Sequence, residues 1–189
     1  DIVAFVDSKS DWLRRRLAAI GDQPLPRQLT YTDGEEHLFL GQRHPLQLGM
    51  ASRAETSISQ GVLQLQLPNP ESAKQVSAQL TGWYRQQAEE LYSRLLDQHF
   101  PFFAERGYKR PQLRIRRMKS RWGSLSSRGY INLNLELIKT PLECIEYVVL
   151  HELCHLEHMN HGAGFRALLG QCLPDWQARR ETLNRAPLI

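Results

Sequence analysis

The sequence predicts an α+β fold in which an antiparallel sheet packs against a helix that carries the pattern His-Glu-x-x-His. That helix is expected near residues 141–158, where apolar residues recur at helical spacing. Residues 62–67, 113–116 and 131–135 instead alternate apolar with polar residues, which indicates half-buried antiparallel strands. With 189 residues, of which 41% are hydrophobic, the chain is long enough to bury the core of such a fold.

We expect one compact unit in which three parts follow one another along the chain. Residues 1–68 form a β-rich part that opens with a short element and a helix within residues 1–20. A further segment is expected before Asp1, because the chain lacks an initial methionine. Residues 69–107 form a long helix and its end, and residues 108–189 carry the candidate site. The strands of the first part are expected at residues 38–40, 46–48 and 62–67.

The helix near residues 141–158 is expected to begin in a capping box. Thr140 would be the N-cap, Pro141 the first helical residue, and Glu143 the acidic residue three positions after the cap. One face of this helix is apolar and is expected to be buried. Its members are Leu142, Ile145, Val148, Val149 and Leu153.

The pentapeptide from His151 to His155 is the strongest chemical signal in the chain. Residues four apart lie on one face of a helix, so His151 and His155 can bind one zinc ion together. Glu152 stands beside the first histidine, where it can hold a water molecule and take its proton as the catalytic base. The pattern therefore predicts a zinc-dependent hydrolase with one metal ion.

Three downstream residues are candidates for the third metal ligand. His158 shares the face of His151 but lies about 10 Å further along the helix axis, too far for zinc–nitrogen bonds of about 2.0–2.1 Å. His161 can converge if the chain turns back near Asn160, and we prefer it. Glu181 is the remaining alternative. We interpret His158 as a solvent-facing or supporting histidine.

Cysteine usage and hydropathy bear on the compartment. Cys144, Cys154 and Cys172 show no C-x-x-C spacing and are odd in number, which fits a reducing cytosol. Cys154 is expected in the core. No apolar run approaches the 18 or more residues of a membrane span. We therefore expect a cytoplasmic protein without membrane association, and a monomer rather than an oligomer.

Basic residues concentrate between residues 106 and 135, with no acidic residue until Glu136, although the formal net charge is only +4. They are Arg106, Lys109, Arg110, Arg114, Arg116, Arg117, Lys119, Arg121 and Arg128. We interpret the segment as two antiparallel strands joined by residues 119–127. These charges either form a solvated sheet face or border the metal cleft and meet an anion. Arg121 is the candidate for binding substrate.

Ordered motifs over about residues 108–170 resemble those of the YgjP-like metal-dependent hydrolases, which are relatives of the SprT-like and WLM zincins. The matching segments are Arg121–Ser124, Ile131–Asn134, Tyr147–Leu156, Asn160–Gly162 and Phe165, with a weaker match at Leu40–Leu46. The resemblance implies a zincin-like α+β fold and one zinc ion. It also implies ligands at His151, His155 and His161, with Glu152 as the base.

Two positions depart from the pattern of that family, and they bear on the shape of the substrate pocket. Leu125 stands where the family commonly has cysteine, and Arg166 where it commonly has tryptophan. Neither position is a ligand candidate, so the expected metal site is unaffected.

The expected function is zinc-dependent hydrolysis by metallopeptidase-like architecture, in which Glu152 activates a water that attacks an amide or a phosphoanhydride. One alternative is a nucleoside-triphosphate pyrophosphatase acting on uridine triphosphate, an activity attributed to the namesake of the family. Another is a DNA-associated protein similar to the SprT-like relatives. We favour a nucleotide or peptide substrate over a nucleic-acid partner.

Overall fold

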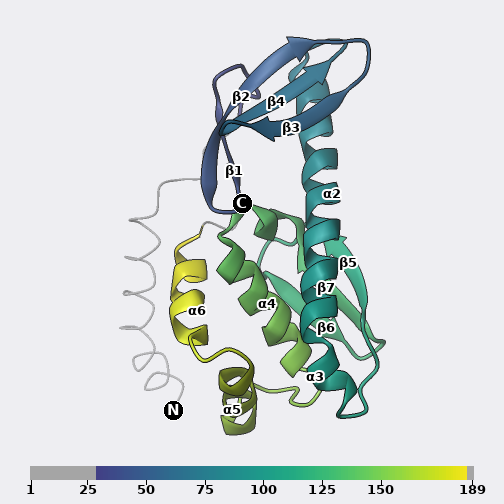
Figure 1. Cartoon of the computed structure of the whole chain (residues 1–189), viewed down its shortest axis with the longest axis vertical. Helices are drawn as coiled ribbons and strands as arrows, with labels where there is room; N and C mark the ends of the chain where they lie inside the picture. Colours follow the sequence, from purple (N-terminus) through teal and green to yellow (C-terminus); the bar gives the residue numbers. More distant parts are fainter. Residues whose placement is uncertain (1–28, 187–189) are drawn as a thin grey trace, which may run out of the picture. The chain divides into compact units, whose positions relative to one another are not determined.

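The computed structural model describes residues 29–186 of the chain. The chain divides into two compact units, residues 1–29 with residue 189 and residues 30–188, and the fold given below is that of the second. The element and helix expected within residues 1–20 lie outside the described residues. The described elements, in chain order, are β1 (Glu36–Phe39), β2 (Gln42–Met50), β3 (Glu55–Ser59), β4 (Val62–Leu67), α2 (Ala73–His99), α3 (Pro101–Ala104), β5 (Gln112–Arg116), β6 (Gly123–Ser126), β7 (Tyr130–Asn134), the 3-10 helix η1 (Leu135–Lys139), α4 (Leu142–Cys154), α5 (Ala163–Cys172) and α6 (Trp176–Arg185) (Figure 1). This confirms the α+β class.

The first sheet has the strand order β1-β2-β4-β3. Strand β4 matches the alternating segment 62–67, and three of its leucines are buried. It pairs antiparallel with β3 but parallel with β2, so the expectation of a purely antiparallel strand was wrong for one of its edges. Strand β3 was not predicted, because its sequence, Glu-Thr-Ser-Ile-Ser, offers a single large apolar residue.

The turn between β1 and β2 connects this sheet to the start of α4. The amides of Leu40 and Gly41 donate to the carbonyls of Ile138 and Lys139. A Cβ atom on Gly41 would lie 2.8 Å from Cγ of Pro141, and Gly41 has a φ of 80°. Glycine is therefore required here both for the left-handed backbone and for the close approach to Pro141.

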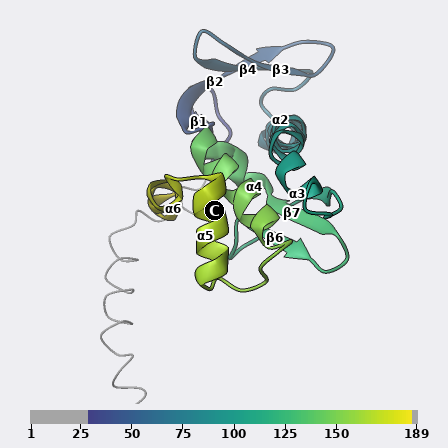
Figure 2. The same ribbon diagram turned by 60° about the horizontal axis from the view of Figure 1, so that its bottom comes forward.

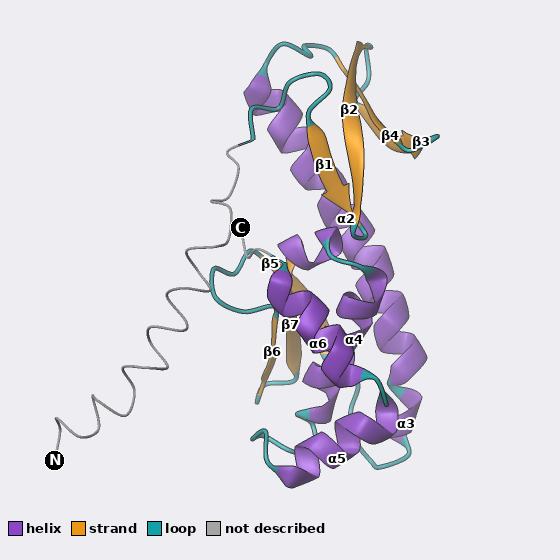
Figure 3. Cartoon of the chain, turned by 90° about the vertical axis from the view of Figure 1, so that its left-hand side faces the viewer, coloured by secondary structure: helices purple, strands orange, loops and turns teal. Residues whose placement is uncertain are grey.

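Helix α2 packs against strands of both sheets and against α4 (Figure 1, Figure 3). It begins after Ser72, whose hydroxyl accepts from the amide of Gln75, rather than at Asn69. Its buried residues recur at helical spacing from Val76 to Leu96, while Ala73 is exposed. Tyr92 is fully buried in this face and donates to the carbonyl of Asn134, which joins α2 to the sheet that borders the site.

The second sheet has the order β5-β7-β6. We expected β5 and β7 to form an antiparallel hairpin, which was wrong, because they pair in parallel. The connection between them contains β6, and β6 pairs antiparallel with β7 through a tight turn at Gly129. The chain reverses between β5 and β6 and again between β6 and β7, so β5 and β7 run in the same direction, and β5 pairs with the edge of β7 that β6 leaves free. The Gly-Ser-Leu-Ser sequence of β6 lacks the apolar alternation that would have predicted it.

Helix α4 carries the His-Glu-x-x-His pattern, but both of its ends differ from the prediction. Thr140 donates its hydroxyl to the carbonyl of Leu137 and closes η1, so it does not cap α4 and the capping box is absent. Leu142 is 46% exposed, whereas Ile145, Val149 and the other expected apolar residues are buried. The helix ends at Cys154, four residues before the predicted end, and a turn follows. Cys154 is buried, as expected.

Helices α5 and α6 both pack against α4, which places them next to the candidate site (Figure 2). Arg179 of α6 forms ion pairs with Glu146 of α4 and with Asp175. It also donates to the carbonyl of Glu143, and its own carbonyl accepts from the thiol of Cys144. These contacts fix α6 along α4. Within residues 29–186, no helix has the length and apolar character needed to cross a bilayer.

Candidate metal centre and active site

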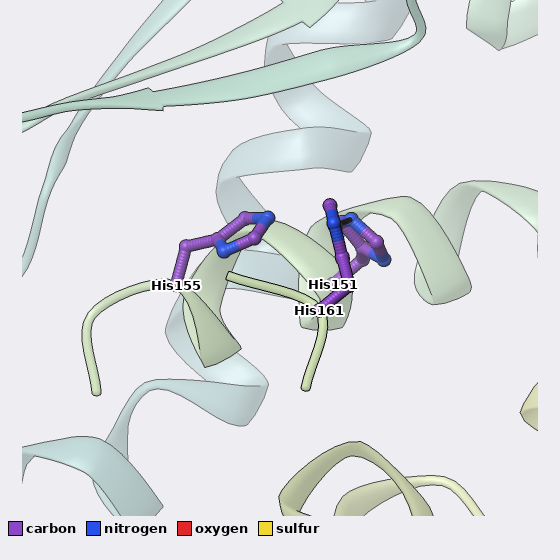
Figure 4. A group of neighbouring side chains, drawn as sticks. All are labelled: His151, His155 and His161. Atoms are coloured by element: carbon purple, nitrogen blue, oxygen red, sulfur yellow. Dashed lines mark hydrogen bonds between the residues drawn. The ribbon is translucent and has the colours of Figure 1, made fainter. Parts of the chain in front are cut away.

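Three histidines converge where α4 ends and α5 begins (Figure 4). His151 and His155 come from the end of α4, and His161 comes from the loop before α5. One ring nitrogen of each lies within 4.8 Å of the corresponding nitrogens of the other two, and Nε2 of His161 is 2.9 Å from Nε2 of His151. In the described part of the chain, this is the only group of three or more histidine, cysteine or acidic residues with such spacing.

The end of α4 at Cys154 is what brings His161 into the group. After Cys154 the chain turns, and the amides of Glu157 and His158 both donate to the carbonyl of Cys154. His161 therefore returns to the helix end instead of continuing along the axis. A straight helix to residue 158 would have carried the chain away from His151.

His158 contributes to the site through its backbone rather than its ring. Nδ1 of His155 lies 2.8 Å from the carbonyl oxygen of His158. A carbonyl only accepts, so Nδ1 of His155 donates and its Nε2 is left as a free lone pair. The His158 ring lies instead over α5, where a Cβ on Gly164 would be 2.8 Å from its Cε1. Glu181 is exposed on α6 and is not part of the group.

Tyr147 and Phe165 support the histidines from two sides. The hydroxyl of Tyr147, one helical turn before His151, lies 3.4 Å from its Nδ1. The ring centroid of Phe165 lies 4.9 Å, 4.7 Å and 4.8 Å from those of His151, His155 and His161. Neither role was predicted from the sequence. The spacing of four residues between Tyr147 and His151 was the available signal for the first.

Glu152 is a buried carboxyl group beside these histidines, with 4% of its surface exposed. Burial raises its pKa from 4.5 to about 8, although the backbone amide of Leu125 and the guanidinium of Arg121 both act to lower the pKa. Its Oε2 has no hydrogen-bond partner among the described residues. A buried oxygen without a partner is costly, which indicates that a ligand normally meets it.

Strand β6 covers Glu152, and glycine permits this. A Cβ on Gly123 would lie 2.7 Å from Oε1 and 2.8 Å from Cγ of Glu152. Residues 121–125 therefore bring Gly123 and the backbone of Leu125 against the carboxyl group, and they bring Arg121 close enough for its charge to lower the pKa of that group. Leu125 stays half-buried and contributes through its main chain, so its departure from the family pattern leaves this contact intact.

The donor set fits a zinc ion. Burial lowers the pKa of His151 to about 3, with further lowering by His155, His161 and Arg180, so this ring is neutral near pH 7. Neutral imidazoles are preferred zinc ligands, and tetrahedral geometry separates ligand nitrogens by about 3.3 Å. The 2.9 Å between Nε2 of His151 and Nε2 of His161 is close to that value. These three residues would hold the ion and leave one of its four positions to water or substrate.

Two cavities meet at Tyr147, His151 and Arg180. The larger, of about 440 Å³, lies on the side of α5 and α6, and the smaller, of about 210 Å³, lies on the side of β6 and Glu152. Arg121 lines the smaller cavity, as the cleft interpretation expected, and Arg166 lines the larger. Sequence reasoning missed Arg180, because nothing in the polar α6 segment distinguishes it from its neighbours.

The other basic residues of segment 106–135 divide between paired and unpaired charges. Arg106, Arg110 and Arg117 lie within ion-pair distance of Glu157, Asp97 and Glu136. The guanidinium of Arg114 lies 3.3 Å from the ring centroid of Tyr130. Part of the segment is therefore a solvated, internally balanced surface, as the first interpretation held.

Comparison with known proteins identifies the family. The profile of the family described as "YgjP-like, metallopeptidase domain" matches residues 1–186. No curated protein matches the chain. The solved structure of the metallopeptidase zymogen abylysin from Pyrococcus abyssi is similar, with 26% identity over 50% of this chain and 90% of that chain, at a TM-score of 0.42. A metallopeptidase family implies a metal ion, which is typically zinc, and the histidine group is compatible with one. Since the profile covers nearly the whole chain, the protein belongs to the YgjP-like metallopeptidase-domain family and is a hydrolase of the metallopeptidase type.

Proposed function

We propose that the protein hydrolyses peptide bonds with one zinc ion bound by His151, His155 and His161 and with Glu152 as the general base. The observation that carries this proposal is Oε2 of Glu152, a buried oxygen without a partner among the described residues, in a cavity that the metal-ligand candidate His151 also lines. A purely structural zinc site fills all four positions with protein ligands and has no use for such a carboxylate.

The residues of the site have distinct roles in this proposal. His155 is held in its ligand form by the carbonyl of His158, and His151 is oriented by the hydroxyl of Tyr147. A bound zinc ion supplies Lewis acidity, which makes a neighbouring water more acidic and polarises a carbonyl oxygen. The positive charge also favours the ionised form of Glu152, which lowers its pKa from about 8 toward a value suited to a base.

Glu152 then moves the proton during the reaction. Its free Oε2 accepts the proton of the attacking water, and the same oxygen can deliver a proton to the leaving amine. Arg121 lines the same cavity as Glu152, and its charge acts to lower the pKa of that carboxyl group. Arg121 is therefore the candidate for stabilising the substrate carbonyl oxygen that becomes negative in the reaction. Phe165 excludes water from beneath the histidines.

Peptide-library cleavage by zinc-loaded protein, followed by mass spectrometry, tests this function. Glu152→Gln keeps the size of the side chain but removes the base, so cleavage should fall by at least about 100-fold. Zinc titration of both proteins should give one ion per chain. Equal cleavage by parent and variant would remove Glu152 from the mechanism.

Hydrolysis of nucleoside triphosphates is a second candidate, because Arg121 and Arg180 both line the cavity of Glu152. A phosphate chain requires several cations, and arginine binds phosphate through paired donors. Phosphate and pyrophosphate release from uridine triphosphate and the other nucleoside triphosphates separates the two functions. Release that disappears in Glu152→Gln, without peptide cleavage, would favour the nucleotide reaction.

Association with DNA is a weaker candidate. It draws on the basic segment, but three of those arginines have acidic partners, namely Glu157, Asp97 and Glu136. A DNA affinity that falls steeply with added salt would support it.

A further inference from the structure

Arg166 and Arg180 place two guanidinium groups along the larger cavity, next to His151 and His161. They come from different helices, α5 and α6, and so approach the cavity from two elements. Among the described residues neither has an acidic partner within ion-pair distance. No residue that the structure describes therefore neutralises their charges.

Arg180 differs sharply from its neighbour Arg179. Arg179 is bound to Glu146 and Asp175 and anchors α6 to α4. One residue further along a helix turns the side chain by about 100°. Arg180 consequently lines both cavities beside His151, while Arg179 holds the helix that carries it.

The cleft as a whole is cationic. In residues 29–186, Glu152 is the only acidic residue that lines either cavity, against Arg121, Arg166 and Arg180. A bound zinc ion would add to this excess. Clefts of one charge attract ligands of the other, and a planar guanidinium matches the two oxygens of a carboxylate.

We infer that Arg166 and Arg180 form an anion subsite that receives the C-terminal carboxylate of a peptide substrate, which makes the enzyme a carboxypeptidase. This rests on the proposed peptide hydrolysis. The volume of about 440 Å³ is in the range of sites for small ligands. Trp176 and Leu169 also line this cavity and offer apolar surface to the side chain of the terminal residue.

The larger cavity contains His151 and His161, and it shares His151 and Arg180 with the cavity of Glu152. A carboxylate held there would therefore bring the last amide bond of the peptide nearest to the metal site. In the reaction the last C–N amide bond breaks, and the oxygen of water joins the carbonyl carbon. Glu152 takes one proton of the water and passes it to the nitrogen of the released amino acid. The products are a peptide shortened by one residue and a free amino acid, so all atoms balance.

Matched peptides test the subsite by binding, independently of turnover. The probes are N-acetyl-Ala-Ala-Phe as the free acid and as the C-terminal amide, titrated calorimetrically into zinc-loaded Glu152→Gln protein. The free acid should bind at least about tenfold more tightly, as expected for charge-assisted hydrogen bonds. Arg166→Gln or Arg180→Gln in this background should reduce the affinity for the free-acid peptide to near that for the amide. The affinity for the amide should not change.

Arg94→Gln is the control, because Arg94 is exposed on α2 and lines neither cavity. It should keep the preference for the acid. Equal binding of acid and amide by the parent overturns the inference, and so does a preference that survives both arginine substitutions. Tight binding of uridine triphosphate that Arg180→Gln abolishes, without any acid preference, also overturns it and assigns the arginines to phosphate.

The failure of the proposed function gives a different result. If the wild type binds the acid preferentially but cleaves no peptide, the subsite stands and peptide hydrolysis fails. If the wild type cleaves internal bonds of acid and amide peptides equally, peptide hydrolysis stands and the subsite fails.

Discussion

Gly123 and Glu152 are in such close contact that glycine is the only residue that fits over the buried carboxyl group. A Cβ on Gly123 would lie 2.7 Å from Oε1, and the Glu152 side chain is too deeply buried to move aside freely. The close packing of strand β6 on helix α4 thus depends on one residue of each element, Gly123 and Glu152.

Gly123→Ala should therefore displace Glu152 and reduce kcat by about tenfold or more, since small displacements of catalytic groups are costly. Zinc affinity should change little, because the three histidines come from other segments. Gly82→Ala is the control: an added Cβ at Gly82 of α2 meets nothing within 4 Å, and the change should stabilise the protein by about 0.5–1 kcal/mol. Steady-state kinetics and chelator competition measure the two effects. A loss of zinc affinity as large as the loss of kcat would contradict the prediction that Gly123→Ala affects the base and not the metal ligands.

His161→Ala should lose most of the zinc affinity, whereas His158→Ala should keep it. His158 supports His155 through its carbonyl, which alanine also has, and its ring lies over Gly164. Competition with a fluorescent chelator measures both affinities. The reverse order would show that the third ligand has been assigned to the wrong histidine.

The stability of the metal-free protein should depend on pH through Glu152. Its folded pKa of about 8 lies above the ordinary 4.5, so the folded state retains a proton that the unfolded state releases. This contribution to stability is complete below pH 4.5 and is lost as pH rises toward 8. Glu152→Gln lacks the titration, so its stability should increase relative to the wild type across that window. Urea unfolding at several pH values measures the difference in unfolding free energy between the two proteins, and the contributions of the histidines cancel in this difference. A difference that does not change with pH would refute the prediction.

Substitution of Arg179 should lower the stability of the fold, whereas substitution of Arg180 should affect substrate binding and not stability. Arg179→Met removes the guanidinium from Glu146, which then keeps only His99 as a described partner, and loosens α6; this should destabilise the fold by about 1–3 kcal/mol. Arg180→Met breaks no ion pair within residues 29–186 and should change stability by less than about 0.5 kcal/mol. Thermal and urea unfolding compare the two. Similar losses in both variants would mean that Arg180 has a structural role.

Tyr147→Phe should weaken zinc binding without unfolding the protein. The hydroxyl of Tyr147 lies 3.4 Å from Nδ1 of His151, a long contact, so the loss should be at the lower end of the 10–100-fold range of such supporting groups, about tenfold. Chelator competition with the wild type as reference measures it. An unchanged affinity would show that Tyr147 does not orient the ligand.

The sequence by itself determined those features that depend on neighbours along the chain. Helical spacing was enough to place His151, Glu152 and His155 on one helix, and the apolar period was enough to place α2. The turn-forming residues around Asn160 were enough to favour His161 over His158 as the partner of His151, and the structure brings that histidine to the group. Such features follow from backbone geometry over one or two turns, which local sequence specifies.

Tertiary structure alone decided what depends on segments far apart. The parallel pairing of β5 with β7 arose because the additional strand β6 lies between them in the chain, and Thr140 closed η1 instead of capping α4. Arg180 reaches the cleft because α6 packs against α4, where Arg179 pairs with Glu146, thirty-three residues earlier in the chain. Long-range contacts of this kind compete for the same backbone and side-chain groups, and their outcome is set by packing rather than by any local pattern.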